Sequence, residues 1–101
     1  MQEVQIIKRE PFLEVALSGD IGSENADDFY NEVVGAYTGS GNITFECAKL
    51  EFIDSTTLGT FVKILKHAKT KGGSLIIKGL SPRLKKLFVI CALDKIMEIE
   101  E

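Results

Sequence analysis

Short apolar runs alternate with longer amphipathic segments along the chain. The first two runs cover residues 4–8 and 12–17, and Pro11 marks a turn between them. The second run alternates apolar with small or polar side chains, as a strand with one buried face does. We therefore predict that the two runs form a β-hairpin.

A helical period replaces the alternation after residue 22. Apolar side chains then recur at spacings of three and four residues, and acidic residues fill the first turn, where a helix N-terminus favours negative charge. We expect Ser23 to cap this first helix. The turn at residues 38–42, with its two glycines, should end it.

The middle of the chain repeats the change from a strand period to a helix period. Residues 43–47 alternate and predict a third strand, followed by a short link over residues 48–52. From Ser55 onward an apolar stripe predicts a second helix, which stops at the glycines of positions 72 and 73. Residues 74–78 carry three consecutive apolar side chains, so we expect a central strand covered on both faces.

The last third of the chain predicts one more helix. Ser81 before Pro82 is typical of a helix start, and an apolar stripe runs from there to Cys91. Residues 96–99 form either a short final strand or a continuation of that helix. The order of elements indicates a single α/β domain over residues 1–101, with a mixed, mainly parallel sheet of four to five strands and helices packed on it.

Composition and charge argue against several classes of protein. The net charge of −3 is unsuited to binding nucleic acid, which requires a basic surface. No stretch approaches the about 20 apolar residues that span a bilayer, and the N-terminus does not resemble a leader, so we expect a cytoplasmic protein without membrane insertion. Cys47 and Cys91 lack metal-ligand spacing, which argues against a metal site. We expect two buried reduced thiols, with a disulfide between them as the alternative.

Several polar residues allow both a functional and a purely structural interpretation. Arg83, Lys85 and Lys86 form either a basic patch for an acidic partner or a solvated helix face, and the solvated face is the simpler interpretation. The single histidine has no nucleophile or orienting group near it in the sequence. A hydrolase that uses Asp20 and Asp54 as its carboxylates is not expected, because a domain of this size rarely has a deep pocket.

Three hydroxyl residues directly follow a carboxylate at the predicted junction of the third strand and the second helix: Asp54, Ser55, Thr56, Thr57. In one interpretation, Asp54 or Ser55 only caps the helix by accepting hydrogen bonds from its free amides. In the other, Ser55 is a phosphorylation site, because a helix N-terminus favours a dianion. The added charge of about −1.5 to −2 would then repel a partner docked at this junction.

The pattern Asp-Ser-x-x-Leu-Gly at residues 54–59, preceded by two apolar residues, resembles the central motif of STAS-domain anti-sigma-factor antagonists. The likeness extends along the chain. Residues 17–21 resemble the end of the family's second strand, the third helix resembles its Ser-Pro-x-apolar start, and residues 93–96 resemble its closing segment.

This resemblance implies a partner-switching regulator of sigma-factor-dependent transcription that is not itself an enzyme. In the family, an anti-sigma factor serine kinase phosphorylates the serine after the aspartate, and the unmodified protein captures that kinase. By this match Ser55 is the phosphoacceptor, and the partner contacts are Asp20, Asp54, Ser55, Thr56, Thr57 and Gly59. The kinase supplies ATP, so we expect no cofactor here. We expect a monomer, and a phosphatase acting on phospho-Ser55 as a further partner.

Two residues depart from the family pattern. Thr57 stands where glycine is usual, and its β-branched side chain would crowd the surface that a kinase approaches. Gly22 stands where many members carry an aspartate, which lowers the local negative charge. These departures keep an alternative function open, in which the chain is a STAS subunit that docks on a lipid-transporting ABC ATPase.

Overall fold

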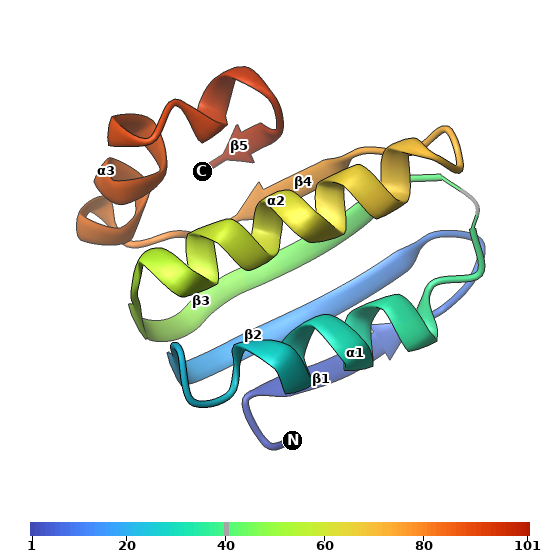
Figure 1. Cartoon of the computed structure of the whole chain (residues 1–101), viewed down its shortest axis with the longest axis horizontal. Helices are drawn as coiled ribbons and strands as arrows, with labels where there is room; N and C mark the ends of the chain where they lie inside the picture. The colour runs from blue at the N-terminus through green and yellow to red at the C-terminus, as the bar shows by residue number, and fades with distance from the viewer. Residues whose placement is uncertain (40) are drawn as a thin grey trace.

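Five strands form one mixed sheet in the order β1-β2-β3-β4-β5 (Figure 1). A computed structural model describes residues 1–39 and 41–101, so part of the turn predicted at residues 38–42 lies outside the described residues. The strands are β1 (Val4–Lys8), β2 (Leu13–Ile21), β3 (Ile43–Ile53), β4 (Leu75–Lys78) and β5 (Glu98–Glu100). β1 pairs antiparallel with β2, and every other neighbouring pair is parallel. The predicted hairpin and the α/β fold are confirmed.

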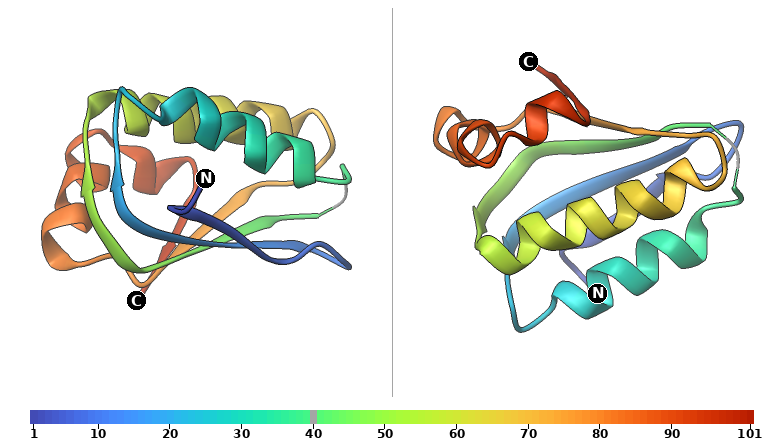
Figure 2. Two further views of the ribbon diagram at one scale, coloured as in Figure 1. Left: turned by 90° about the horizontal axis from the view of Figure 1, so that it is seen from below. Right: turned by 45° about the horizontal axis from the view of Figure 1, so that its top comes forward.

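The helices cover only one face of this sheet. α1 (Ala26–Ala36) and α2 (Ser55–Lys69) lie side by side on it, while α3 (Pro82–Ile90) packs near the carboxyl ends of β3 and β4 (Figure 2). A 3-10 turn, η1 (Leu93–Lys95), leads from α3 to β5. Within residues 1–39 and 41–101, no helix covers the opposite face. Ile76 therefore stays half-exposed there, and the prediction that β4 is covered on both faces is wrong.

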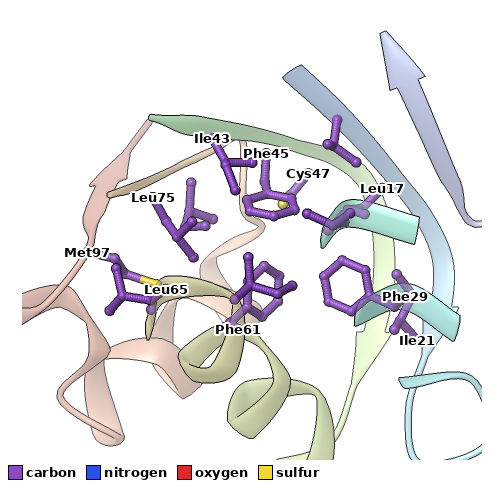
Figure 3. Packing of buried hydrophobic residues seen from close by; sticks show 14 of the residues in the cluster. Leu17, Ile21, Phe29, Ile43, Phe45, Cys47, Phe61, Leu65, Leu75 and Met97 are labelled. Carbon is purple, nitrogen blue, oxygen red and sulfur yellow. The ribbon is translucent and has the colours of Figure 1, made fainter. Parts of the chain in front are cut away.

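The core lies between the sheet and the helices, and its centre is aromatic (Figure 3). Phe61 of α2 packs edge-to-face with Phe29 of α1, Phe45 of β3 and Phe88 of α3, with ring centroids 5.2, 5.2 and 5.3 Å apart. Each such pair adds about 0.5–1.5 kcal/mol to the burial of the rings. One side chain of α2 thus joins all three helices to the sheet.

β3 extends six residues beyond the strand predicted at residues 43–47. Its buried side chains are Ile43, Phe45, Cys47, Leu50 and Ile53, so their spacing changes from two to three after Cys47. The pairing with β2 is irregular in the same region. β-bulges insert an extra residue and bend a strand. The bent ends of β2 and β3 curve toward the helices and carry the start of α2 over the core (Figure 2, left).

α1 begins later than predicted. Its N-cap is Asn25, not Ser23. The Asn25 side chain holds the preceding turn, because its amide oxygen accepts from the Gly22 N–H at 2.8 Å and its amide nitrogen donates to the Asp20 carbonyl at 3.1 Å. The turn therefore occupies residues 22–25, and Ala26 is the first residue of the helix.

The C-terminal third matches the prediction except at one cysteine. Ser81 caps α3 by accepting from the Leu84 N–H at 3.3 Å, and Pro82 is the first helical residue. Residues 98–100 form the short final strand, which was one of the two alternatives for this segment. Both cysteines are free thiols, and Cys47 is buried as expected. Cys91 is exposed, contrary to expectation, because the helix ends there and its buried stripe stops at Phe88.

Candidate functional site

Two chain segments meet at the carboxyl end of the sheet, where α1 and α2 both begin (Figure 1). The β2–α1 turn and the β3–α2 junction enclose a shallow depression. Its lining residues are Asp20, Gly22, Ser23, Glu24, Asn25, Phe52 and Asp54. Ser55, the first residue of α2, follows directly and is exposed. The depression and the first turn of α2 together form the candidate site.

Asp54 ties the two segments together. As the N-cap of α2, it accepts the Thr57 N–H through Oδ1 at 3.1 Å and the Ser23 N–H through Oδ2 at 3.0 Å. These two backbone hydrogen bonds, the Ser23 bond first, hold the pKa of Asp54 below its ordinary value. Asp54 is therefore ionised near neutral pH, and its carboxylate links α2 to the β2–α1 turn.

The glycine at position 22 has a local explanation. A Cβ atom on Gly22 would lie 2.8 Å from Asp54 Oδ2, closer than a Cβ atom approaches a neighbour in real structures. Asp54 thus occupies the space that a side chain at position 22 would need. At position 22, where many family members carry an aspartate, a glycine therefore leaves room for the Asp54 carboxylate.

Thr57 lies inside the domain rather than on its surface. Its side chain is fully buried. The Thr57 hydroxyl accepts from the Asp54 N–H at 3.3 Å and donates to the Ile21 carbonyl at the end of β2. With the Asp54 cap, this makes a reciprocal capping box. The expectation that Thr57 crowds the surface and contacts a partner directly is therefore wrong, because the side chain points inward.

Ser55, Thr56 and Gly59 share the exposed surface of the first turns of α2. Residues three and four positions apart lie on the same side of a helix, so Gly59 is the neighbour of both hydroxyl residues one turn later. Asp20 is also exposed, and its position at the end of β2 places it on the rim of the depression. The structure thus brings the predicted surface residues together around Ser55.

Phe52 is a member of this site that sequence reasoning did not identify. Its side chain is 50% exposed and lines the depression beside Asp54. A signal was present in the sequence, because adjacent strand residues point to opposite faces, so a sheet covered on one face exposes either Phe52 or Ile53. The alternation alone did not show which of the two faces the core.

Negative side chains lie in the depression and are absent from the first turn of α2. Three carboxylates, from Asp20, Glu24 and Asp54, line the depression, whereas the first turn of α2 carries no acidic side chain. The Ser55 hydroxyl therefore lies at the positive end of a helix dipole and next to a negative surface. A phosphoryl group on Ser55 would be tolerated by the helix but would add charge to an already acidic region.

The described residues contain neither a group of side chains that could hold a metal ion nor a membrane-spanning helix. Within residues 1–39 and 41–101, no three His, Cys, Asp or Glu side chains are grouped so that they could ligate a metal ion. In the same part of the chain, no helix has the length and apolar character needed to cross a membrane.

The first prediction concerns the buried Thr57 hydroxyl. Thr57→Val keeps the shape of the side chain but removes the hydroxyl that bonds the Ile21 carbonyl and the Asp54 N–H, so we expect the free energy of unfolding to fall by about 1–3 kcal/mol. Thr57→Ser, which keeps the hydroxyl, should lose less stability than the valine variant. Urea denaturation measures both. Equal stability of wild type and the valine variant would contradict this role of Thr57.

The second prediction concerns pH. A carboxylate with a lowered pKa in the folded state stabilises the fold above its unfolded pKa, and this contribution is lost as pH falls through the folded pKa. Wild type should therefore exceed Asp54→Asn in stability at pH 7, and the difference should shrink below about pH 4. Thermal unfolding from pH 7 to pH 2.5 measures this, with the exposed Asp94→Asn as control. A pH-independent difference would show that the Asp54 charge is irrelevant.

Comparisons with known proteins match nearly the whole chain. A family model described as the STAS domain matches residues 3–101. The anti-sigma-B factor antagonist of Bacillus subtilis (strain 168) is 31% identical over 96 residues, which covers 95% of this chain and 88% of that protein. The anti-sigma-B factor antagonist of Staphylococcus epidermidis is 28% identical over 99 residues, which covers 97% of this chain and 92% of that protein.

Solved structures share the fold. A candidate anti-sigma factor antagonist from Thermotoga maritima superposes with a TM-score of 0.82 at 22% identity, over 97% of this chain and 84% of that chain. The anti-sigma factor antagonist SpoIIAA in its unphosphorylated form gives a TM-score of 0.77 at 20% identity, over 95% of this chain and 84% of that chain. By the family match and its curated relatives, the chain belongs to the STAS domain family, in the group of the anti-sigma-factor antagonists.

Proposed function

We propose that this chain is a cytoplasmic, monomeric anti-sigma-factor antagonist that captures an anti-sigma factor kinase and is switched off by phosphorylation at Ser55. The proposal rests on one observation, namely that the residues capping α2 are different from the exposed serine that follows the cap. Asp54 and Thr57 form the cap, while Ser55 is exposed beside them. The fold therefore does not depend on the Ser55 hydroxyl, which is left available for modification.

Two findings on relatives support this proposal. The curated relatives that match the chain are anti-sigma-B factor antagonists. SpoIIAA, whose fold the chain shares, has been solved in both its unphosphorylated and its phosphorylated form. Ser55 lies in the motif that resembles the phosphorylated segment of this family.

Charge provides the switch. The kinase supplies ATP and a catalytic base, the Ser55 oxygen attacks the γ-phosphorus, the bond to the ADP oxygen breaks, and the hydroxyl proton passes to that base. The product carries about −1.5 to −2 of additional charge next to Asp54. A partner docked on this surface then meets like-charge repulsion and a desolvation cost. Hydrolysis by a phosphatase, with water as the nucleophile, restores the original surface. The chain itself needs no cofactor and catalyses no step.

The surface of the kinase complex should include the exposed residues of the site. Asp20, Asp54 and Thr56 supply polar contacts around Ser55. Phe52 supplies an apolar contact, since a half-exposed aromatic side chain within a polar rim is typical of an interface anchor. Thr57 supports this surface from below without touching the partner.

The third prediction tests the switch. Ser55→Asp should abolish kinase binding while the melting temperature changes little, and Ser55→Ala should retain binding. Thr38→Asp, which adds a charge at an exposed threonine after α1, at the other end of the sheet, is the matched control and should bind normally. Isothermal titration against the cognate kinase measures the affinities, and incubation with ATP followed by mass spectrometry locates the phosphoryl group.

Three outcomes of these measurements would contradict the proposal: unchanged kinase binding by Ser55→Asp, incorporation of phosphate at a residue other than Ser55, or the absence of a kinase partner. Capture of the ATPase of a lipid transporter by both wild type and Ser55→Asp, in place of a kinase, would instead support the role of a docking subunit.

Gly59 gives independent support for a partner surface beside Ser55. It lies inside α2, where glycine is less favourable than alanine by about 1 kcal/mol. A Cβ atom at Gly59 would meet no atom within 4 Å, so the fold does not require a glycine there. Gly35 in α1 has the same open surroundings, but it lies near the end of that helix, away from Ser55. The two glycines therefore form a natural pair for comparison.

The fourth prediction uses this pair. Gly59→Ala and Gly35→Ala should each stabilise the domain by up to about 1 kcal/mol, which raises the melting temperature by several degrees. Only Gly59→Ala should weaken kinase binding, by about tenfold or more, because its methyl group separates the two surfaces. Calorimetry and titration measure the two effects. Equal binding by both variants would exclude close approach of a partner at Gly59.

A further inference from the structure

The outer face of α3 has an unusual combination of charge and exposed apolar surface. Residues 80–93 contain three basic side chains and no acidic one, in a chain of net charge −3. Only Leu84 and Phe88 of α3 are buried. On the exposed side, Val89 and Ile90 are 46% and 68% exposed, and Ile96 after η1 is 44% exposed. This face is therefore both basic and apolar.

A hollow lies on this face. Its lining residues are Leu80, Pro82, Lys85, Lys86, Val89 and Glu101. Leu80, Pro82 and Val89 supply its apolar lining, here called the floor, and Lys85 and Lys86 supply two positive charges, here called the rim. Lys85 Nζ contacts the carboxylate of Glu101, from the segment after β5, at 2.5 Å. The Glu101 side chain is otherwise 86% exposed, so a carboxylate on an exposed segment already lies against this rim.

We propose that this hollow docks an acidic segment with apolar side chains from a partner protein, at a surface separate from the Ser55 site. The apolar floor offers most of the binding free energy, and the lysines select for negative charge and orient the segment. Glu101 competes for Lys85 until the partner's carboxylate replaces it. In this proposal, the three residues of the predicted basic patch have different roles. Lys85 and Lys86 rim the hollow, whereas Arg83 donates to the Glu51 carbonyl of β3 at 2.7 Å.

Two other occupants fit this surface less well. An anionic membrane is a continuous negative surface and would meet Glu98 and Glu100 of β5 as well as the lysines, whereas a single acidic segment can place its carboxylates on Lys85 and Lys86 alone. A second copy of the chain would have to place its own acidic depression, with Phe52, on the hollow. Such a head-to-tail contact does not close on a dimer and builds a ring or an open filament, which does not fit the monomer proposed above.

The test titrates the ¹⁵N-labelled full chain with a synthetic amidated peptide of alternating glutamate and leucine pairs, and with its lysine–leucine counterpart. We expect saturable amide shifts around Leu80, Lys86 and Val89 with the acidic peptide only. Lys86→Glu should weaken this binding by about tenfold, since it reverses a rim charge. Lys63→Glu makes the same change at an exposed lysine of α2 and should leave the affinity unchanged.

Several results would overturn the docking surface. They are the absence of saturable shifts at millimolar peptide, equal weakening by both lysine variants, or shifts centred on Ser55. Co-sedimentation with phosphatidylglycerol vesicles that Lys86→Glu alone abolishes would assign the face to lipid, and self-association that Lys86→Glu alone abolishes would assign it to a second copy. Ser55→Asp should bind the peptide normally, so failure of this proposal and failure of the switch at Ser55 are distinguishable.

Discussion

The reciprocal cap between Asp54 and Thr57 is the interaction on which the candidate site depends. The Asp54 carboxylate holds the first amides of α2 and the Ser23 amide at once, while the Thr57 hydroxyl reaches back to the end of β2. The bonds to Ser23 and Ile21 join two distant segments of the chain, and the bent ends of β2 and β3 bring these segments together. The core and the site are thus coupled through the strand bulges and one buried threonine.

The charged surfaces of the domain are divided between two regions. The depression at the start of α1 and α2 is acidic, and the half-exposed Phe52 is one of its lining residues. The hollow on α3 is basic, with an apolar floor. Because like charges placed at an interface disfavour wrong partners, the two regions suit different classes of protein segment. The two proposals together give this domain one partner under phosphorylation control and a second partner that binds independently of it.

The order of elements could be predicted from the sequence, because hydrophobic periodicity distinguishes strands from helices. The second helix starts at Ser55 as expected, since a strong cap residue precedes a clear apolar stripe. The end of β3 was missed because bulges change the spacing of buried residues after Cys47, and alternation no longer describes the strand. The inward position of Thr57 also could not be predicted, because its acceptor, the Ile21 carbonyl, lies 36 residues earlier in the chain.

The free position of Ser55 has an evolutionary consequence. Since other side chains form the cap, the residue at position 55 is under little pressure from folding. Under the proposed switch, a single base change that replaces the serine with a residue lacking a hydroxyl would give a folded protein that the kinase could not inactivate at position 55. On this proposal, lineages could convert a regulated protein into a permanently active one, and back again, without passing through an unstable intermediate.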